Sequence, residues 1–170
     1  LEVFKGMGAD LTVETKADGV EPAGDITLRY RPLKAGAAIA GDIIPRLIDE
    51  LPIIAVVAAT AAGTTSIKDA QELRVKESDR LSLMVRTLKA FGVKVAETED
   101  GMERTGGAEP VAVPGHVDAA GDHRMAMSMA VAGLRAAGEV RFAGEDCIAV
   151  SFPGFAGLLN GLGADMAEGG

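Results

Sequence analysis

The sequence is poor in the residue types on which several classes of protein depend. Among its 170 residues it has no tryptophan, two histidines, one cysteine and 4% aromatic residues. The single cysteine, Cys147, rules out an intrachain disulfide, and no spacing of His and Cys resembles a zinc site, so we expect no metal centre. The few aromatics and the net charge of −8 argue against a nucleic-acid partner.

Long hydrophobic runs are also missing. The longest apolar stretch, residues 51–62, is too short to span a bilayer, and the chain does not open with a charged and then apolar signal peptide. We therefore expect a soluble protein with no membrane partner, in a reducing and cytoplasmic setting.

What the sequence does contain is one segment of dense charge, residues 72–81 (ELRVKESDRL), ahead of a predicted amphipathic helix. Backbone N–H groups at a helix start attract anions. The cations Arg74, Lys76 and Arg80 therefore suit a phosphate or carboxylate, and Glu77 among them could carry a proton. On charge pattern alone, a solvated and charge-balanced helix start explains the segment equally well.

Glycine marks the predicted helix ends. In three places a helix-like segment closes at a glycine, the expected left-handed cap, and a short alternating strand follows. These glycines are Gly8, Gly92 and Gly163. Strand pairs are predicted after the amphipathic helices, at 11–13 with 25–30 and at 93–95 with 101–105.

Two longer apolar helices are predicted at residues 49–62 and 122–137, followed by strands at 64–68 and 139–142. The unit of buried helix, strand, amphipathic helix and strand occurs twice, which indicates a duplicated α/β module. Because both long helices are apolar on all sides, we expect βαβαββ units that pack these helices inward. The fold class is therefore α/β (α+β).

Acidic residues stand at the expected starts of these helices: Asp49, Glu77 and Asp122. Aspartate is a favoured N-cap, so capping by itself explains Asp49 and Asp122. His123 and Arg124 beside Asp122, however, repeat the mixed acidic and basic character of residues 76–80 at the same end of the module. This repetition favours a shared site.

Two segments, residues 75–80 (VKESDR) and 121–127 (GDHRMAM), resemble the signature segments of the 5-enolpyruvylshikimate-3-phosphate synthase family, the 3-phosphoshikimate 1-carboxyvinyltransferases. The similarity continues in family order through residues 44–52 (IPRLIDELP), 63–65 (GTT) and 151–153 (SFP), and so covers nearly the whole chain.

The resemblance implies a two-domain protein more than twice this length, in which each domain has three βαβαββ units around inward helices, an inside-out α/β barrel. Residues 1–170 would then be a single domain truncated at its N-terminal side, without its partner domain. It would contain a partial unit, residues 1–31, and units at about 32–105 and 106–170. Substrates of the family bind between the two domains.

The reaction that the resemblance implies moves the carboxyvinyl group of phosphoenolpyruvate to the 5-hydroxyl of shikimate 3-phosphate and releases phosphate, without a cofactor. The full-length protein is expected to be monomeric and cytoplasmic, and the chain alone to lack turnover. Two alternatives are a relative that acts on a UDP-sugar and a non-catalytic module that binds anions.

The resemblance also implies site residues. Asp49 matches the aspartate that binds the target hydroxyl of shikimate 3-phosphate and acts as base, and Glu77 the proton-donating glutamate, which also contacts phosphoenolpyruvate. Lys76 matches a lysine that contacts shikimate 3-phosphate. The residues that match ligands of phosphoenolpyruvate are Arg80, His123 and Arg124.

Four further residues are placed outside the site or depart from the family. Val150 stands where many relatives carry a lysine that reaches the phosphoenolpyruvate side, and Glu72 where some carry a neutral ligand of shikimate. We expect Cys147 to be a packing residue and His116 to lie on the surface.

Overall fold

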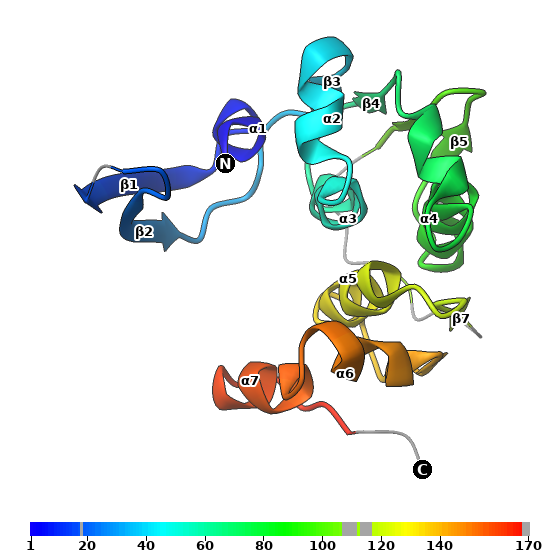
Figure 1. The fold of residues 1–170 in the computed structure, drawn as a ribbon. Helices are drawn as coiled ribbons and strands as arrows, with labels where there is room; N and C mark the ends of the chain where they lie inside the picture. The colour runs from blue at the N-terminus through cyan, green and yellow to red at the C-terminus, as the bar shows by residue number, and fades with distance from the viewer. Residues whose placement is uncertain (18, 107–111, 113–116, 168–170) are drawn as a thin grey trace.

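The structure is a computed structural model that describes residues 1–17, 19–106, 112 and 117–167. In this part of the chain, helices alternate with short strands that form one four-stranded sheet and two two-stranded sheets. Figure 1 shows an N-terminal hairpin, a central sheet with its helices, and a C-terminal group of helices. This mixture of helix and strand agrees with the predicted α/β class.

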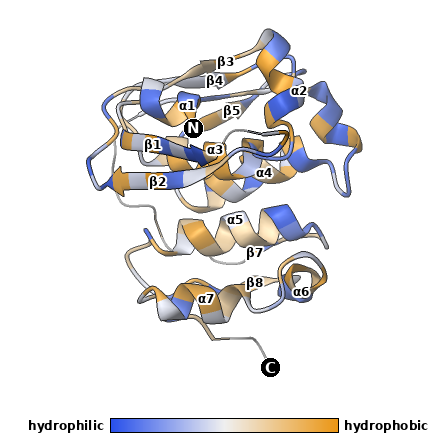
Figure 2. Ribbon diagram, turned by 60° about the vertical axis from the view of Figure 1, so that its left-hand side comes forward, coloured by the Kyte–Doolittle hydropathy of each residue, from blue (hydrophilic) through white to orange (hydrophobic). Residues whose placement is uncertain are grey.

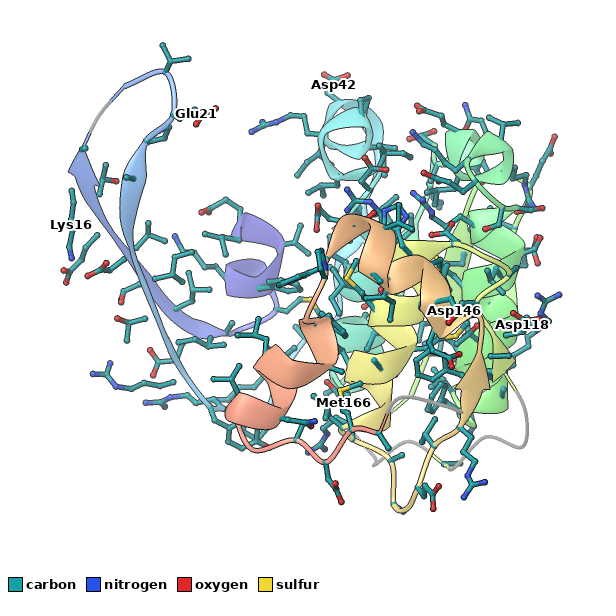
Figure 3. The ribbon with its side chains drawn as sticks, turned by 60° about the horizontal axis from the view of Figure 1, so that its bottom comes forward. Lys16, Glu21, Asp42, Asp118, Asp146 and Met166 are labelled. Carbon is teal, nitrogen blue, oxygen red and sulfur yellow. The ribbon has the colours of Figure 1, made fainter. Side chains whose placement is uncertain are left out.

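The N-terminal elements are α1 (Glu2–Gly6), β1 (Asp10–Ala17) and β2 (Ala23–Arg29). The two strands pair antiparallel, with Leu11 opposite Leu28. They form a ribbon that projects away from the helices, with Lys16 and Glu21 on its outer part (Figure 3). The predicted strand pair is confirmed, although both strands are longer than expected.

The central sheet has the order β3-β4-β6-β5, in which β3 and β4 are parallel and the other neighbours antiparallel. Its strands are β3 (Ala38–Ile39), β4 (Thr65–Ile67), β5 (Val95–Glu97) and β6 (Met102–Arg104). The helical elements between them are η1 (Gly41–Ile43), α2 (Ile44–Leu47), α3 (Leu51–Ala59), η2 (Gln71–Val75) and α4 (Arg80–Ala90). The order β3, α3, β4, α4, β5, β6 is that of the predicted βαβαββ unit.

The C-terminal group repeats the first four elements of this order. Its elements are β7 (Val117–Asp118), α5 (His123–Gly133), β8 (Phe142–Ala143), η3 (Glu145–Cys147), α6 (Ile148–Ser151) and α7 (Phe155–Gly161). β7 and β8 pair in parallel, as strands joined by a helical crossover do. The division into units at residues 105 and 106 stays a prediction.

The core lies where α3, α4 and α5 pack against one another. Leu51, Met84 and Met129 are at most 2% exposed. α5 lies between the helices α3 and α4 on one side and the C-terminal α6 and α7 on the other (Figure 2). Most residues of α3 are buried, as expected for a helix that is apolar on all sides, so the predicted inward helices are confirmed.

Both long helices are shorter than predicted. α3 begins at Leu51 because Pro52 lacks an N–H group, which places it in the first turn of a helix. α5 ends at Gly133, and the following residues form tighter turns in which Leu134 N–H bonds to Val131 O. The glycine caps were predicted correctly: Gly8, Gly92 and Gly163 all have positive φ.

The strand expected at residues 164–166 does not form, since the structure describes these residues without regular secondary structure. The backbone N–H of Met166 donates to Asn160 Oδ1 (2.8 Å), and its carbonyl accepts from Asn160 Nδ2 (2.9 Å). Both backbone groups of Met166 are therefore held by a side chain of α7 rather than by a neighbouring strand. The strand predicted at residues 139–142 is likewise reduced to β8.

Two minor expectations concern Cys147 and His116. Cys147 is partly buried against the core, where its thiol donates to Gly144 O, and burial raises the pKa of the thiol. Its role as a packing residue is confirmed, whereas His116 lies outside the described residues. In the described part of the chain, no helix is long and apolar enough to cross a membrane.

The close approach of β4 to the β5–β6 hairpin depends on Gly101. A Cβ atom at this position would lie 1.9 Å from Ile67 O, a backbone atom that is held in the sheet. We expect Gly101→Ala to lower the free energy of unfolding by about 1–3 kcal/mol, because backbone must move to admit the methyl group.

Gly157→Ala is the matched control for this test. Gly157 lies inside α7, and a Cβ there would meet no atom within 4 Å. Alanine favours a helix interior over glycine, so this variant should unfold at the same or higher denaturant concentration. Equal destabilisation by the two substitutions in urea melts would contradict the prediction.

Candidate active site

Three segments that are far apart in the sequence meet at the N-terminal ends of the core helices. They are the turn between α2 and α3, the residues that lead into α4, and the start of α5. Asp79 caps α4 by accepting from Ser82 N (3.0 Å), and Asp122 caps α5 by accepting from the backbone N–H groups of Arg124 and Met125. The capping role predicted for Asp122 is confirmed.

Asp49 does not cap a helix. α3 begins at Leu51, with Glu50 at the capping position and no capping hydrogen bond from a side chain. The carboxylate of Asp49 instead accepts from Arg80 Nη1 (3.1 Å) and lies 3.7 Å from Arg124 Nη2. Capping as the explanation for Asp49 is therefore wrong.

The guanidinium of Arg80 joins these segments. Its Nε donates to Asp122 Oδ2 (2.9 Å), its Nη1 to Asp49, and its Nη2 to Glu77 Oε2. We call Asp49, Glu77, Arg80 and Asp122 the Arg80 cluster. One positive charge thus holds carboxylates from three separate parts of the chain.

The Arg80 cluster has a buried side and an open side. The side chains of Arg80 and Asp122 are 0% exposed, whereas those of Asp49 and Glu77 are 46% and 50% exposed. The two carboxylates predicted to transfer protons are therefore the two that solvent, or a substrate, can reach. The buried Arg80 donates hydrogen bonds to both of them and is itself held by the buried Asp122.

Both buried members of the cluster are charged at neutral pH. Burial opposes the ionisation of Asp122, but the hydrogen bonds and charge of Arg80, with the backbone N–H of Met125, outweigh it and hold the pKa of Asp122 below its usual range. Burial likewise opposes the charge of Arg80, and the hydrogen bond and charge of Asp122 outweigh it, so the pKa of Arg80 is raised. The pair is ionic.

Arg124 and His123 extend the site along the start of α5. Arg124 Nη1 donates to the backbone oxygen of Asp49 (3.0 Å) and to Glu50 Oε1 (3.3 Å), and its side chain is 34% exposed. His123 is the first residue of α5 and is partly buried. The structure thus brings Arg124 against Asp49, as a shared site requires.

Lys76 is paired with a residue that the sequence did not place in the site. Its Nζ lies 2.9 Å from Glu72 Oε1, four residues earlier. The hydrogen bond from Lys76 to Glu72, and the charges of Glu72 and Asp49, raise the pKa of Lys76. The i, i+4 spacing of opposite charges was the signal in the sequence for this pair.

Arg74 does not join the other cations of its segment. Its guanidinium donates to Glu97 Oε1 (2.8 Å), to Asp79 Oδ2 (3.2 Å) and to the carbonyl oxygens of Thr98 and Glu99. It ties the residues before α4 to the end of β5. The prediction that Arg74 clusters with Lys76 and Arg80 to bind an anion is therefore wrong for Arg74.

Ser78 was missed by the sequence reasoning. Its hydroxyl donates to Asp122 Oδ2 (3.0 Å), so it fixes the backbone next to Glu77.

Val150 lies on α6 with 86% of its surface exposed. Among the described residues, no group of His, Cys, Asp and Glu is arranged to hold a metal ion.

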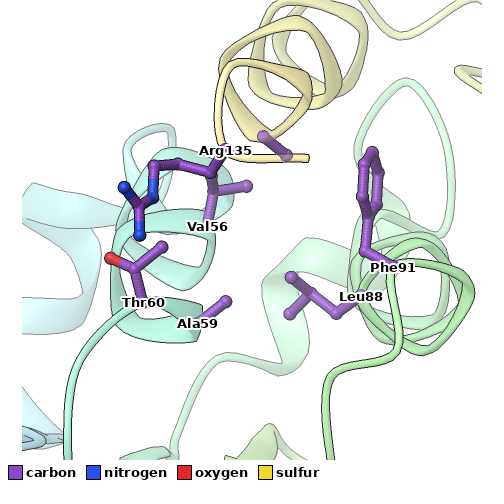
Figure 4. A pocket seen from close by; sticks show the side chains of 7 residues that line it. Val56, Ala59, Thr60, Leu88, Phe91 and Arg135 are labelled. Atoms are coloured by element: carbon purple, nitrogen blue, oxygen red, sulfur yellow. The ribbon is translucent and has the colours of Figure 1, made fainter. Parts of the chain in front are cut away.

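A small, mostly apolar cavity lies among α3, α4 and the end of α5, as Figure 4 shows. It is lined by Val56, Ala59, Thr60, Leu88, Phe91, Ala132 and Arg135. These residues lie toward the C-terminal ends of the helices, opposite to the Arg80 cluster. The cavity is a gap in core packing, and the charged groups suited to chemistry are at the other end.

Solved structures define the class of protein to which this arrangement belongs. The chain is similar to an EPSP synthase from Acinetobacter baumannii, with a TM-score of 0.86 and 42% identity over 94% of this chain and 37% of that one. The enolpyruvyl transferase NikO from Streptomyces tendae has the same fold, with a TM-score of 0.63 at 24% identity. The chain has the α/β fold of an enolpyruvyl transferase domain.

Sequence relatives narrow the class to a family. The family model for EPSP synthase (3-phosphoshikimate 1-carboxyvinyltransferase) matches residues 1–159, so the chain belongs to this family. A 3-phosphoshikimate 1-carboxyvinyltransferase from Desulforamulus reducens is 52% identical over 161 residues, which are 94% of this chain and 37% of that protein. One from Salinibacter ruber is 52% identical over 156 residues. The chain spans little more than a third of the length of these relatives.

The pair of Glu72 and Lys76 gives a direct test of the site's electrostatics. We expect Glu72→Gln to lower the pKa of Lys76, because the negative charge that favours the protonated ammonium is lost, and the remaining amide oxygen is a weaker, uncharged acceptor. An NMR titration of the lysine ε-methylene signals would measure the change. Glu139→Gln, which removes the partner of Arg141 instead, should leave the pKa of Lys76 unchanged.

Proposed function

We propose that the chain forms one wall of an active site that transfers the carboxyvinyl group of phosphoenolpyruvate to the 5-hydroxyl of shikimate 3-phosphate. The product is 5-enolpyruvylshikimate 3-phosphate, and inorganic phosphate is released. The observation that carries this proposal is the Arg80 cluster, in which Asp49 and Glu77 share one buried guanidinium and face outward. Membership of the EPSP synthase family supports the choice of substrates.

Asp49 acts as the base. Its half-exposed carboxylate is fixed by Arg80 and lies beside Arg124, so it can accept a hydrogen bond from the 5-hydroxyl and take its proton as the oxygen attacks. The attacked atom is C2 of phosphoenolpyruvate. A fixed acceptor lowers the barrier because the hydroxyl is already oriented when the substrate arrives.

Glu77 supplies the proton on the other side of the reaction. A carboxylic acid that protonates the methylene carbon, C3, creates positive charge at C2. The oxygen of the 5-hydroxyl then bonds to C2 and neutralises this charge. Phosphate leaves from C2 of the resulting tetrahedral adduct with the proton that Asp49 accepted, and Glu77 takes back a proton from C3, which restores the double bond. Since Asp49 and Glu77 hold the same guanidinium, the two proton transfers take place close together.

The cations bind the negative groups of the two substrates. Arg124 and Lys76 are partly exposed and lie beside Asp49 and Glu72 respectively, so they can meet phosphoenolpyruvate and shikimate 3-phosphate. The Nη groups of Arg80 are engaged by Asp49 and Glu77. Contact of Arg80 with phosphoenolpyruvate therefore requires one carboxylate to turn away, which the exposed side of Glu77 allows. His123 contributes a hydrogen bond to the same substrate.

The rest of the protein supplies the opposite wall of the site, so we expect the chain alone to lack turnover. From the family resemblance we also propose that the full-length protein is monomeric and cytoplasmic, and that it binds glyphosate together with shikimate 3-phosphate. Release of phosphate by the full-length protein that carries this chain, dependent on both substrates, is the experiment that tests the proposal. Transfer to a UDP-sugar instead, or anion binding without transfer, would overturn it.

Glu77→Gln in that full-length protein should lower kcat by about 10²–10⁴-fold, because glutamine cannot donate the proton. KM for both substrates should change little, since the amide keeps the shape of the side chain. Steady-state phosphate release measures both quantities. Glu103→Gln, on the exposed face of β6, is the control and should behave as the wild type. An unchanged kcat in Glu77→Gln would remove Glu77 from the mechanism.

Arg124→Ala should mainly weaken phosphoenolpyruvate. Loss of a charge-assisted contact should raise its dissociation constant by about 10- to 100-fold, which isothermal calorimetry would measure. Arg141→Ala, which removes an exposed arginine paired with Glu139, provides the control. If binding of phosphoenolpyruvate were equally strong in both variants, Arg124 would not be its ligand.

A further inference from the structure

Asp122 is the most enclosed carboxylate of the candidate site, and the mechanism proposed above does not use it. We propose that Asp122 is a positioning residue, which fixes Arg80 and Ser78 and through them sets the places of Asp49 and Glu77. The catalytic part of this inference rests on the proposed function. Its geometric part rests on the contacts of Asp122 alone.

Asp122 is attached to a buried helix of the core, α5. Its Oδ1 accepts from the backbone N–H groups of Arg124 (3.0 Å) and Met125 (3.2 Å), so the carboxylate is fixed to the first turn of α5. That helix is buried through Met125 and Met129, which are 2% and 0% exposed. The carboxylate therefore has a fixed position and direction before it meets any other group.

The second oxygen faces the site. Oδ2 accepts from Arg80 Nε (2.9 Å) and from Ser78 Oγ (3.0 Å), and Arg80 Nη2 lies 3.4 Å from Oδ1. A carboxylate has about four lone-pair positions, and five donors surround this one. Asp122 is thus fully occupied and cannot bind a substrate group, which distinguishes it from Asp49 and Glu77.

The contact at Nε determines the orientation of the whole guanidinium. Because the group is planar, fixing Nε on Asp122 leaves Nη1 directed to Asp49 and Nη2 directed to Glu77. The bond to Ser78 fixes the residue next to Glu77 in the chain. The positions of the exposed carboxylates of Asp49 and Glu77 therefore both depend on the buried carboxylate of Asp122.

Helix capping by itself does not require these contacts. A cap needs one acceptor oxygen, and Oδ1 already provides it. The division of roles between the two oxygens makes Asp122→Asn informative, because asparagine keeps a capping oxygen and replaces Oδ2 with an N–H₂ group. That group is a donor, so it cannot accept from Arg80 Nε or from Ser78 Oγ.

We expect Asp122→Asn in the full-length protein to lower kcat by about 10²-fold, the effect of a small displacement of reacting groups, while KM changes less. Far-UV circular dichroism should stay that of the wild type. Asp118→Asn is the matched control: Asp118 Oδ1 also accepts a backbone N–H, that of Ala120 (2.8 Å), but Asp118 lies outside the Arg80 cluster. Its turnover should be unchanged.

A second measurement does not depend on activity. In protein labelled with ¹⁵N-arginine, Arg80 Nε–H held by a buried carboxylate should give a slowly exchanging NMR signal, which Asp122→Asn removes. Ser78→Ala deletes one hydrogen bond without touching the cap or the charges, and it should lower kcat by a smaller factor. If Asp122→Asn does not fold, Ser78→Ala decides the catalytic part.

Wild-type turnover in Asp122→Asn, or in Ser78→Ala where only that variant folds, would overturn the proposal. An Arg80 Nε–H signal that is unchanged in Asp122→Asn would overturn its geometric part. If the wild-type protein transfers no carboxyvinyl group, the proposed function fails instead. The control of Arg80 by Asp122 is then judged by the NMR signal alone.

Discussion

The candidate site depends on one interaction, the ion pair between the buried guanidinium of Arg80 and the buried carboxylate of Asp122. Removing two charges from water is unfavourable, and only close contact with further hydrogen bonds offsets the penalty. Here Asp122 receives backbone N–H groups, and Arg80 also donates to Asp49 and Glu77. The turn before α3, the segment before α4 and the start of α5 are joined by this pair, so the site and the domain's packing are not independent.

The same ion pair divides the site into a buried side and an exposed side. Asp49 and Glu77 are exposed and can meet a substrate, whereas Arg80 and Asp122 are buried. The exposed carboxylates are therefore held by an ion pair that water does not reach. A preorganised support of this kind favours charge development in a transition state, because little reorganisation is needed when the reaction occurs. The apolar helices contribute by holding the ends of α4 and α5 together.

Much of the fold was predictable because the signals are local. The all-round apolar character of α3 and α5, the glycine cap at Gly92 and the strand alternation in β1 depend on residues a few positions apart. The failures occurred where distant or competing groups decide. Pro52 shortened α3 from its start, and Asn160 took the backbone bonds of Met166 that a strand would have used.

The sequence by itself determined which residue types stand at the helix starts, that Asp122 would cap a helix, and which family the signature segments resemble. Only the tertiary structure decided that Arg80 is enclosed by three carboxylates, that Arg74 turns to Glu97, and that Ser78 reaches Asp122. The physical reason is distance along the chain: Arg80 is 42 residues from Asp122 and 31 from Asp49. Side-chain direction there follows from how the core helices pack, which no local pattern contains.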